Sequence, residues 1–350
     1  HFDMSEIVQR QGTVISAALL GAIAGSGALP FAGHCFRDLL SSGGSAAANL
    51  AAFDESFRRA QSGGVEEYVP PRAEPFTLPV ATNALGERWL PRIADLPEAL
   101  HETAYHSINR LIDYQDEAYA EEWLSRLSAV IDRDSDMEGR ALSHETGRHL
   151  ALWMAFEDIP RVAQLKVRPD REAMIRSEVN AAPEQPVTVA EFFHPRVEEV
   201  AALLPERWGR ALLGSATASG WLGRLLGPRT LRTDRIGMQL ILRGLAGLRR
   251  FRRSTLGYAH ERHMIDRWYD AVLSAKTQDA ALAIAALGSM VKGYGATRHR
   301  TTSRLMQILN YLEQSSESDA GTIASLHRAA MTPDSTFEID DITLPDPELA

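Results

Sequence analysis

The chain has a single cysteine, Cys35, in 350 residues. One thiol excludes an intrachain disulfide, a thiolate-ligated iron–sulfur cluster and an all-thiolate zinc site built from this chain alone. No run of eighteen apolar residues is present, so no membrane-spanning helix is expected. The first residues lack the basic and apolar regions of a signal peptide, and we therefore expect a cytoplasmic protein.

Basic residues are fewer than acidic ones. The 37 basic side chains are outnumbered by 46 acidic ones, which gives a net charge of −9. This balance does not favour a nucleic-acid partner. The hydrophobic content of 45% and charged content of 24% are ordinary for a globular protein, and the length allows two domains or one large domain with an appendage.

Helical periodicity dominates the chain, and the predicted fold class is mainly α. Residues 1–60 are predicted to form helices over 5–24, 31–41 and 45–60. Prolines and glycines concentrate in residues 61–94, which predicts a linker. Residues 95–331 are predicted to form a large helical domain, and residues 332–350 an acidic tail. The segment "PVTVAEFF" (186–193) is the best strand candidate, although Thr188 or Glu191 can equally cap a helix.

Two pairs of histidines invite a metal-site interpretation. His144 and His149 in "SHETGRH" are five residues apart, which separates them by roughly 140° on a regular helix, so they cannot share one metal. His260 and His263 in "AHERHM" do share a face, but two histidines make an incomplete site. A helix surface with local ion pairs, such as Arg262 with Asp266, is favoured there. No metal site is predicted.

Arginines cluster in residues 224–253, which contain nine of them and one acid, Asp234. Apolar residues are interleaved among them, including Ile236, Leu240, Ile241, Leu245 and Leu248. The pattern predicts a basic amphipathic helix. Its basic side is either a solvated face over a packed apolar side, a surface for an acidic protein partner, or a surface for membrane or nucleic acid.

The loop "MVKGYGATRHR" (290–300) is the most ligand-like stretch of the second half. Its glycines allow close approach of the backbone, and its basic residues precede or begin a helix whose N-terminus favours an anion. A structural turn between two helices explains the same glycines. The candidate phosphate contacts are Lys292, Gly293, Gly295, Arg298 and Arg300.

A second glycine-rich stretch, "AGSGALPF" (24–31), follows a helical pattern and precedes Pro30. Gly25 and Gly27 are therefore predicted to end a helix and not to form a phosphate loop. No G-x-S-x-G elbow is present and no nucleophile triad can be assembled, so we predict no catalytic residue in this chain.

Several segments together resemble a known family. Residues 12–53, with "GAIAGSGALP", look like the closing helices of the gamma-type domain of 2-oxoacid:ferredoxin oxidoreductases. The later segments are similar to the helical domain that follows it in indolepyruvate ferredoxin oxidoreductase beta subunits; they are "LIDYQDEAYAEEWLSRL" (111–127), "HLALWMAFEDIPRVAQLKVR" (149–168), "VAEFFHPRVEEVAALLP" (189–205), "STLGYAHERHMIDRWYDAVL" (254–273) and "MVKGYG" (290–295).

The resemblance implies a subunit of an enzyme that oxidatively decarboxylates arylpyruvates to an aryl-acetyl-CoA and reduces ferredoxin. Thiamine diphosphate, magnesium and iron–sulfur clusters are implied on the large partner subunit, and no cofactor on this chain. CoA and ferredoxin are implied as partners of the complex.

The chain departs from the family at one point. The glycine-rich "G-x-G-G-Q-G" turn of the gamma-type domain, and the sheet that carries it, are absent, so residues 1–60 would be the terminal helices of an incomplete α/β domain. No catalytic residue of the family transfers to a position here. The alternative function is a stand-alone helical module that binds a phosphorylated ligand or an anionic surface through Lys292 and its neighbours.

Overall fold

The computed structural model describes most of the chain. The described residues are 2–41, 46–62, 75–179, 181–193, 196–227, 229–293, 295–315, 319–332 and 337. The described part is mainly α-helical with two short strands, which confirms the predicted fold class. It divides into two compact units, His1–Pro75 and Phe76–Ala350. Most of the predicted linker (63–74) and of the predicted tail (333–350, except Phe337) falls outside the described residues.

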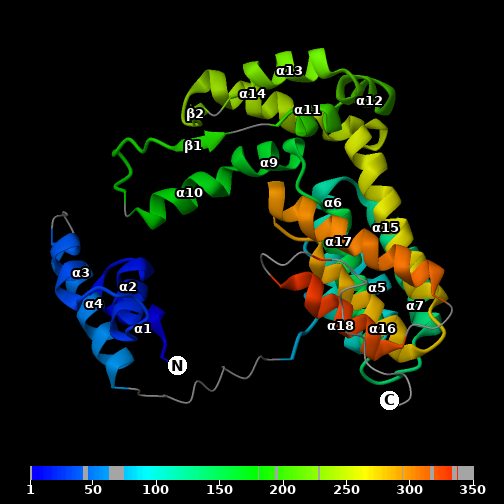
Figure 1. Ribbon diagram of the computed structural model, residues 1–350, viewed down its shortest axis with the longest axis horizontal. Helices are drawn as coiled ribbons and strands as arrows, with labels where there is room; N and C mark the ends of the chain where they lie inside the picture. Colours follow the sequence, from blue (N-terminus) through cyan, green and yellow to red (C-terminus); the bar gives the residue numbers. More distant parts are fainter. Residues whose placement is uncertain are drawn as a thin grey trace. The chain divides into compact units, whose positions relative to one another are not determined.

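The first unit consists of four helices (blue in Figure 1), α1 (Met4–Gln11), α2 (Ile15–Gly25), α3 (Gly33–Leu40) and α4 (Ala46–Gln61). The prediction of one helix over 5–24 is wrong, because Gly12 adopts a left-handed conformation (φ 65°) that ends α1. The predicted stop after α2 is confirmed: Gly25 is its last residue and Gly27 has φ 69°.

Helices α2 and α4 pack at close range through glycine. A Cβ added at Gly21 would lie 2.3 Å from the carbonyl oxygen of Phe53, and one added at Gly25 would lie 2.4 Å from that of Phe57. Backbone atoms cannot rotate out of the way as a side chain can. The two glycines, one helical turn apart, therefore set the spacing of the two helices.

This contact predicts a stability effect. Gly21→Ala should lower the free energy of unfolding of the first unit by about 1–3 kcal/mol, because the new methyl group forces α4 away. Gly220→Ala is the control, since an added Cβ there meets nothing within 4 Å. Urea denaturation followed by far-UV circular dichroism measures both, and equal midpoints for Gly21→Ala and the parent chain would refute the close-packing argument.

The second unit contains a helical bundle (Figure 1). Its helices are α5 (Ala84–Ala94), α6 (His101–Tyr114), α7 (Glu117–Arg133), α8 (Ala141–Met154), α16 (Gln278–Ala286), α17 (Gly295–Gln314) and α18 (Ala320–Met331), with short 3-10 helices η1 (Glu98–Leu100) and η3 (Leu287–Met290). Trp123 and Trp268 are fully buried in its core. Their indole N–H groups donate to the carbonyls of Gly147 and Ile284, each at 2.9 Å, so burying them leaves no unpaired donor.

Helix α5 corrects the linker prediction for residues 84–94. Asn83 caps the helix by accepting from the Gly86 N–H at 2.9 Å. Pro91 lies inside it, and Trp89 and Ile93 are buried in the bundle core. The buried side chains outweigh the helix-breaking tendency of one proline.

The remaining elements form a second part of the same unit, which we call the lobe. They are α9 (Ile159–Lys166), α10 (Pro169–Glu178), β1 (Ala190–Phe193), α11 (Val197–Leu203), α12 (Glu206–Gly214), α13 (Ala216–Leu225), β2 (Arg229–Arg232), α14 (Ile236–Gly247) and η2 (Leu248–Ser254). The predicted strand is confirmed as β1, and it pairs antiparallel with β2. Helix α15 (Leu256–Ser274) joins lobe and bundle, because it contacts α11, α12 and η2 as well as α8, α16 and α17.

Candidate functional site

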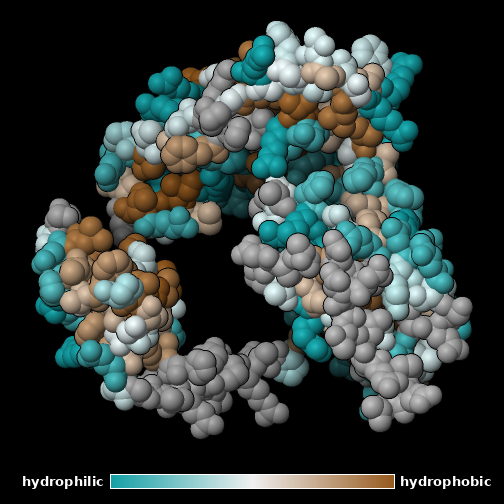
Figure 2. Space-filling model, in the orientation of Figure 1, coloured by the Kyte–Doolittle hydropathy of each residue, from teal (hydrophilic) through white to brown (hydrophobic). Residues whose placement is uncertain are grey.

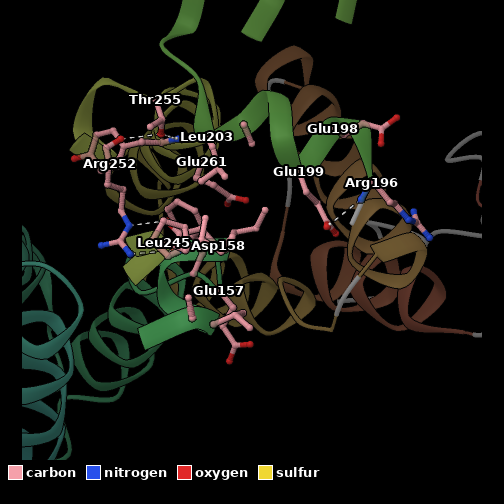
Figure 3. Close-up of a pocket in the computed structure, with 18 of the residues that line it drawn as sticks. Glu157, Asp158, Arg196, Glu198, Glu199, Leu203, Leu245, Arg252, Thr255 and Glu261 are labelled. Carbon is pink, nitrogen blue, oxygen red and sulfur yellow. Dashed lines mark hydrogen bonds and ion pairs between the residues drawn. The ribbon is translucent and has the colours of Figure 1, made fainter. Parts of the chain in front are cut away.

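A cavity of about 1380 Å³ lies where the lobe meets the bundle. Its walls come from α9, β1, α11, β2, α14, η2 and the first turns of α15 and α17 (Figure 3). Most of the wall is apolar, and the apolar lining residues include Ile159, Val162, Ala163, Leu203, Leu242, Leu245, Met264 and Met306. A concave, mainly apolar site with a few polar groups is the usual form of a small-molecule site.

Arg252 forms the most buried polar contact of this cavity. Its side chain is 1% exposed and binds Asp158 at 2.6 and 3.0 Å, the Tyr114 carbonyl at 2.8 Å and Gln115 Oε1 at 2.6 Å. The guanidinium also lies 3.8 Å above the Tyr114 ring. Burial opposes its charge, but the hydrogen bond that Arg252 donates to Asp158 and the nearby negative charge leave the pKa of Arg252 above its ordinary value. Arg252 therefore stays charged and ties η2 to α9 and the end of α6.

Glu261 forms a second, partly buried anchor on α15. Its carboxylate accepts two hydrogen bonds from Arg298 Nη2, both at 2.8 Å, and one from Trp153 Nε1 at 2.7 Å. A third ion pair, Lys166 with Glu191, joins α9 to β1. Desolvation by burial lowers the pKa of Lys166. These three acid–base pairs neutralise most of the charge that the cavity walls carry.

The structure does not gather the five predicted phosphate contacts. Gly295, Arg298 and Arg300 line the cavity, while Lys292 and Gly293 are not among its lining residues. Arg298 forms an ion pair with Glu261. Gly293 (φ 81°) and Gly295 (φ 55°) have left-handed backbone conformations before and at the start of α17, as a turn into this helix requires.

The secondary structure of residues 224–253 also differs from the prediction. The segment is not one basic amphipathic helix but β2, α14 and η2 in succession, because the Arg232–Asp234 pair and the turn before Ile236 interrupt it. Arg252 faces inward, and Arg253 pairs with Asp116 at 2.8 Å. The apolar residues expected on a packed side are partly exposed: Ile236 at 80%, Leu240 at 64% and Ile241 at 56%.

Three of the four paired histidines, His144, His260 and His263, are exposed on their helices, and His149 is buried. Arg262 Nε lies 3.2 Å from Asp266 Oδ1, which confirms the predicted ion pair beside His263. His149 is buried and shares a 2.9 Å hydrogen bond with Glu145, one turn before it on α8. Among the described residues, no three His, Cys, Asp or Glu side chains are placed to hold one metal ion. No helix within the described ranges has the length and apolar character needed to cross a membrane.

A partly buried cluster joins α8, η3 and α18. Ser289 Oγ lies 3.0 Å from His327 Nε2, and His327 is close enough to His149, Lys292 and Glu145 to be affected by their charges. Burial lowers the pKa of His149, and the charges of Arg148 and His144 lower it further. Burial also lowers the pKa of His327, with further lowering by the charges of His149 and Lys292. The charge of Glu145 opposes both shifts. Both imidazoles are therefore held neutral near pH 7.

This cluster predicts a stability loss on mild acidification. Because the two folded-state pKa values lie below the ordinary value of 6.5, the unfolded chain binds more protons as the pH falls below 6.5, and stability drops until the folded-state values are passed. His327→Gln should reduce the fall in melting temperature between about pH 7 and about pH 5.5. His263→Gln, at an exposed position on α15, should keep the parent's pH dependence. An identical fall in parent and His327→Gln chains would contradict this assignment.

Sequence reasoning missed the cavity and its two anchors. Arg252 is 94 residues from Asp158, and Glu261 is 108 residues from Trp153. No local spacing reports contacts at that separation. The one available signal was the excess of arginine in 224–253, and it did not distinguish the buried Arg252 from its exposed neighbours.

Comparison with known proteins gives a family but no function. No curated protein and no solved structure matches the chain. One family model matches residues 100–311, a range that contains every residue lining the cavity. The chain therefore belongs to the family of unknown function DUF6537.

Proposed function

We propose that this chain is the non-catalytic helical part of a 2-oxoacid:ferredoxin oxidoreductase beta subunit that acts on indolepyruvate or another arylpyruvate. Thiamine diphosphate, magnesium and the iron–sulfur clusters belong to the large partner subunit, and CoA and ferredoxin engage the assembled complex. The support is the resemblance of residues 12–53 and of the five later segments to that family. The chain's own role is to bind and position the partner.

The observation that carries this role is a strongly basic, partly apolar surface on the lobe. Residues 206–253 hold eleven arginines and two acids, a net charge of +9 in a chain of net −9. Both acids are already paired, Glu206 with Arg210 and Asp234 with Arg232. We call the exposed part of this segment the arginine-rich surface; it comprises Arg207, Trp208, Trp221, Arg224, Arg235, Ile236, Leu240, Ile241, Arg243, Arg249, Arg250 and Phe251.

The composition of this surface matches that of protein interfaces. Trp208 is 60% exposed, Trp221 67% and Phe251 55%. Tryptophan and arginine are the residue types most enriched among the side chains that dominate binding energy. Figure 2 shows hydrophobic residues at the surface of this segment beside strongly hydrophilic ones. An acidic partner surface with apolar pockets complements it in both charge and shape.

The first unit supports the same proposal. Ile15, Leu19 and Ile23 recur every four residues along α2 and are 53%, 47% and 37% exposed. The opposite face of α2 is already buried against α1 and α4. A helix that is apolar on both faces is normally covered on both. We propose that this outer face is covered in the assembled enzyme.

Mixing the purified chain with the large subunit tests the proposal. A complex should form at low ionic strength and weaken as salt rises, because screening reduces attraction between exposed charges. Co-elution in size-exclusion chromatography measures this, and separate elution at every ionic strength would refute the role.

Titration with CoA or a nucleotide, without the partner, tests the alternative binding module. The subunit proposal predicts no tight binding that depends on Lys292. The structure gives the module little support, since Arg298 is paired with Glu261 and Lys292 is not among the residues that line the cavity.

A further inference from the structure

Two arginines of the cavity are left without an acidic partner. Arg196 begins α11 and Arg300 lies in the second turn of α17, and both line the cavity. Within the described residues neither forms an ion pair, whereas Lys166, Arg252 and Arg298 each do. The two arginines are therefore the positive groups of the cavity that remain available to a ligand.

Their surroundings add positive potential at one end of the cavity. A Cβ added at Gly295, the first residue of α17, would lie 3.4 Å from Nη2 of Arg196. The guanidinium thus lies against the N-terminus of a 20-residue helix, the end where the helix dipole repels a cation and attracts an anion. An anion between the two would remove that repulsion.

The acids that line the cavity do not supply this anion. Figure 3 shows the carboxylates of Glu157 and Glu198 directed away from the apolar middle of the cavity. Glu199 accepts from the backbone N–H of Arg196 at 3.3 Å and caps α11. Glu191, Asp158 and Glu261 are paired as described above.

The rest of the wall is suited to an apolar body. The cavity is larger than the usual 300–1000 Å³ of a small-molecule site, so a long or multi-ring group fits it.

We infer that this cavity binds an amphipathic organic anion, with its apolar body between α9, α14 and α15 and its anionic group at Arg196, Arg300 and the N-terminus of α17. The anionic group is a carboxylate or a phosphate. The site lies wholly within residues 156–306 and does not depend on the proposed oxidoreductase role.

Anilinonaphthalene sulfonate, an aromatic body with one negative charge, is the probe. Its uncharged counterpart, N-phenyl-1-naphthylamine, is the matched ligand control. We expect one site in fluorescence titration of the full chain. Arg196→Gln/Arg300→Gln should weaken the sulfonate at least tenfold and change the neutral probe less than twofold, because only the charge contact is lost.

Two variants separate the cavity from exposed apolar patches. Ala163→Trp, which narrows the cavity from the α9 side, should weaken binding of both probes, while Arg224→Gln/Arg243→Gln on the arginine-rich surface should leave both unchanged. Displacement by dodecanoate, dodecyl phosphate or inorganic phosphate then identifies the anionic group. Sulfonate binding that is unaffected by the Arg196→Gln/Arg300→Gln double substitution, or binding of both probes that is unaffected by Ala163→Trp, overturns the inference, as does inorganic phosphate displacing the probe as well as the two long-chain ligands do.

Discussion

Arg252→Ala should lower the free energy of unfolding of the second unit by about 3–5 kcal/mol. The substitution removes the cation, leaves the largely buried Asp158 carboxylate with only the backbone N–H of Arg161 as a donor, and takes away the guanidinium that donates to the Tyr114 carbonyl. It also removes the guanidinium stacked on the Tyr114 ring. Breaking a buried ion pair from one side is costly because the remaining charge is desolvated and uncompensated. Urea denaturation followed by tryptophan fluorescence measures the loss.

The neighbouring Arg253→Ala is the matched control. Arg253 is 45% exposed and pairs with an Asp116 side chain that is 41% exposed, so the solvent screens the pair. Such pairs contribute about 0–1 kcal/mol. If the two variants lose the same stability, Arg252 is not the buried anchor that its contacts indicate.

Arg224→Glu/Arg243→Glu should weaken the complex with the large subunit by about a hundredfold. Each reversal replaces attraction by repulsion at an acidic partner surface, and about 1.4 kcal/mol per position gives tenfold in Kd. Both side chains are exposed and form no ion pair within the described part of the chain, so folding should not change. Calorimetric titration at about 0.1 M salt measures the effect.

Arg110→Glu/Arg328→Glu carries the same change in net charge at exposed positions on α6 and α18. It should leave Kd within about threefold, because long-range charge is screened beyond roughly 10 Å at 0.1 M salt. If both double substitutions weakened binding of the large subunit equally, net charge, and not the arginine-rich surface, would control association.

Local signals predicted the helical fold class and the strand β1, since both follow from periodicity and breakers over a few residues. These local signals gave wrong helix boundaries at two places. The local pattern predicts a helix break at Pro91, but Trp89 and Ile93 are buried in the bundle core and the helix forms. Periodicity predicts one continuous helix across Gly12, because the apolar pattern resumes at Ile15. In the structure Gly12 ends α1, and a second helix begins at Ile15.

The candidate site was less accessible to sequence reasoning. The sequence of the loop at 290–300 predicts a ligand contact, and Gly295 and Arg300 do line the cavity. Arg196 lies about 100 residues earlier, in a segment that the family resemblance includes but that has no ligand-binding motif. Whether an arginine is free or paired depends on acids such as Glu261 and Asp158, which only the folded chain brings near.

Hydrogen exchange of this chain, measured with and without the large subunit at low salt, tests the central claim most directly. The account predicts that amides of residues 206–253 gain protection on mixing, because the arginine-rich surface is covered, and that those of α6 and α18 do not. Unchanged exchange across 206–253 in the presence of excess large subunit would contradict it.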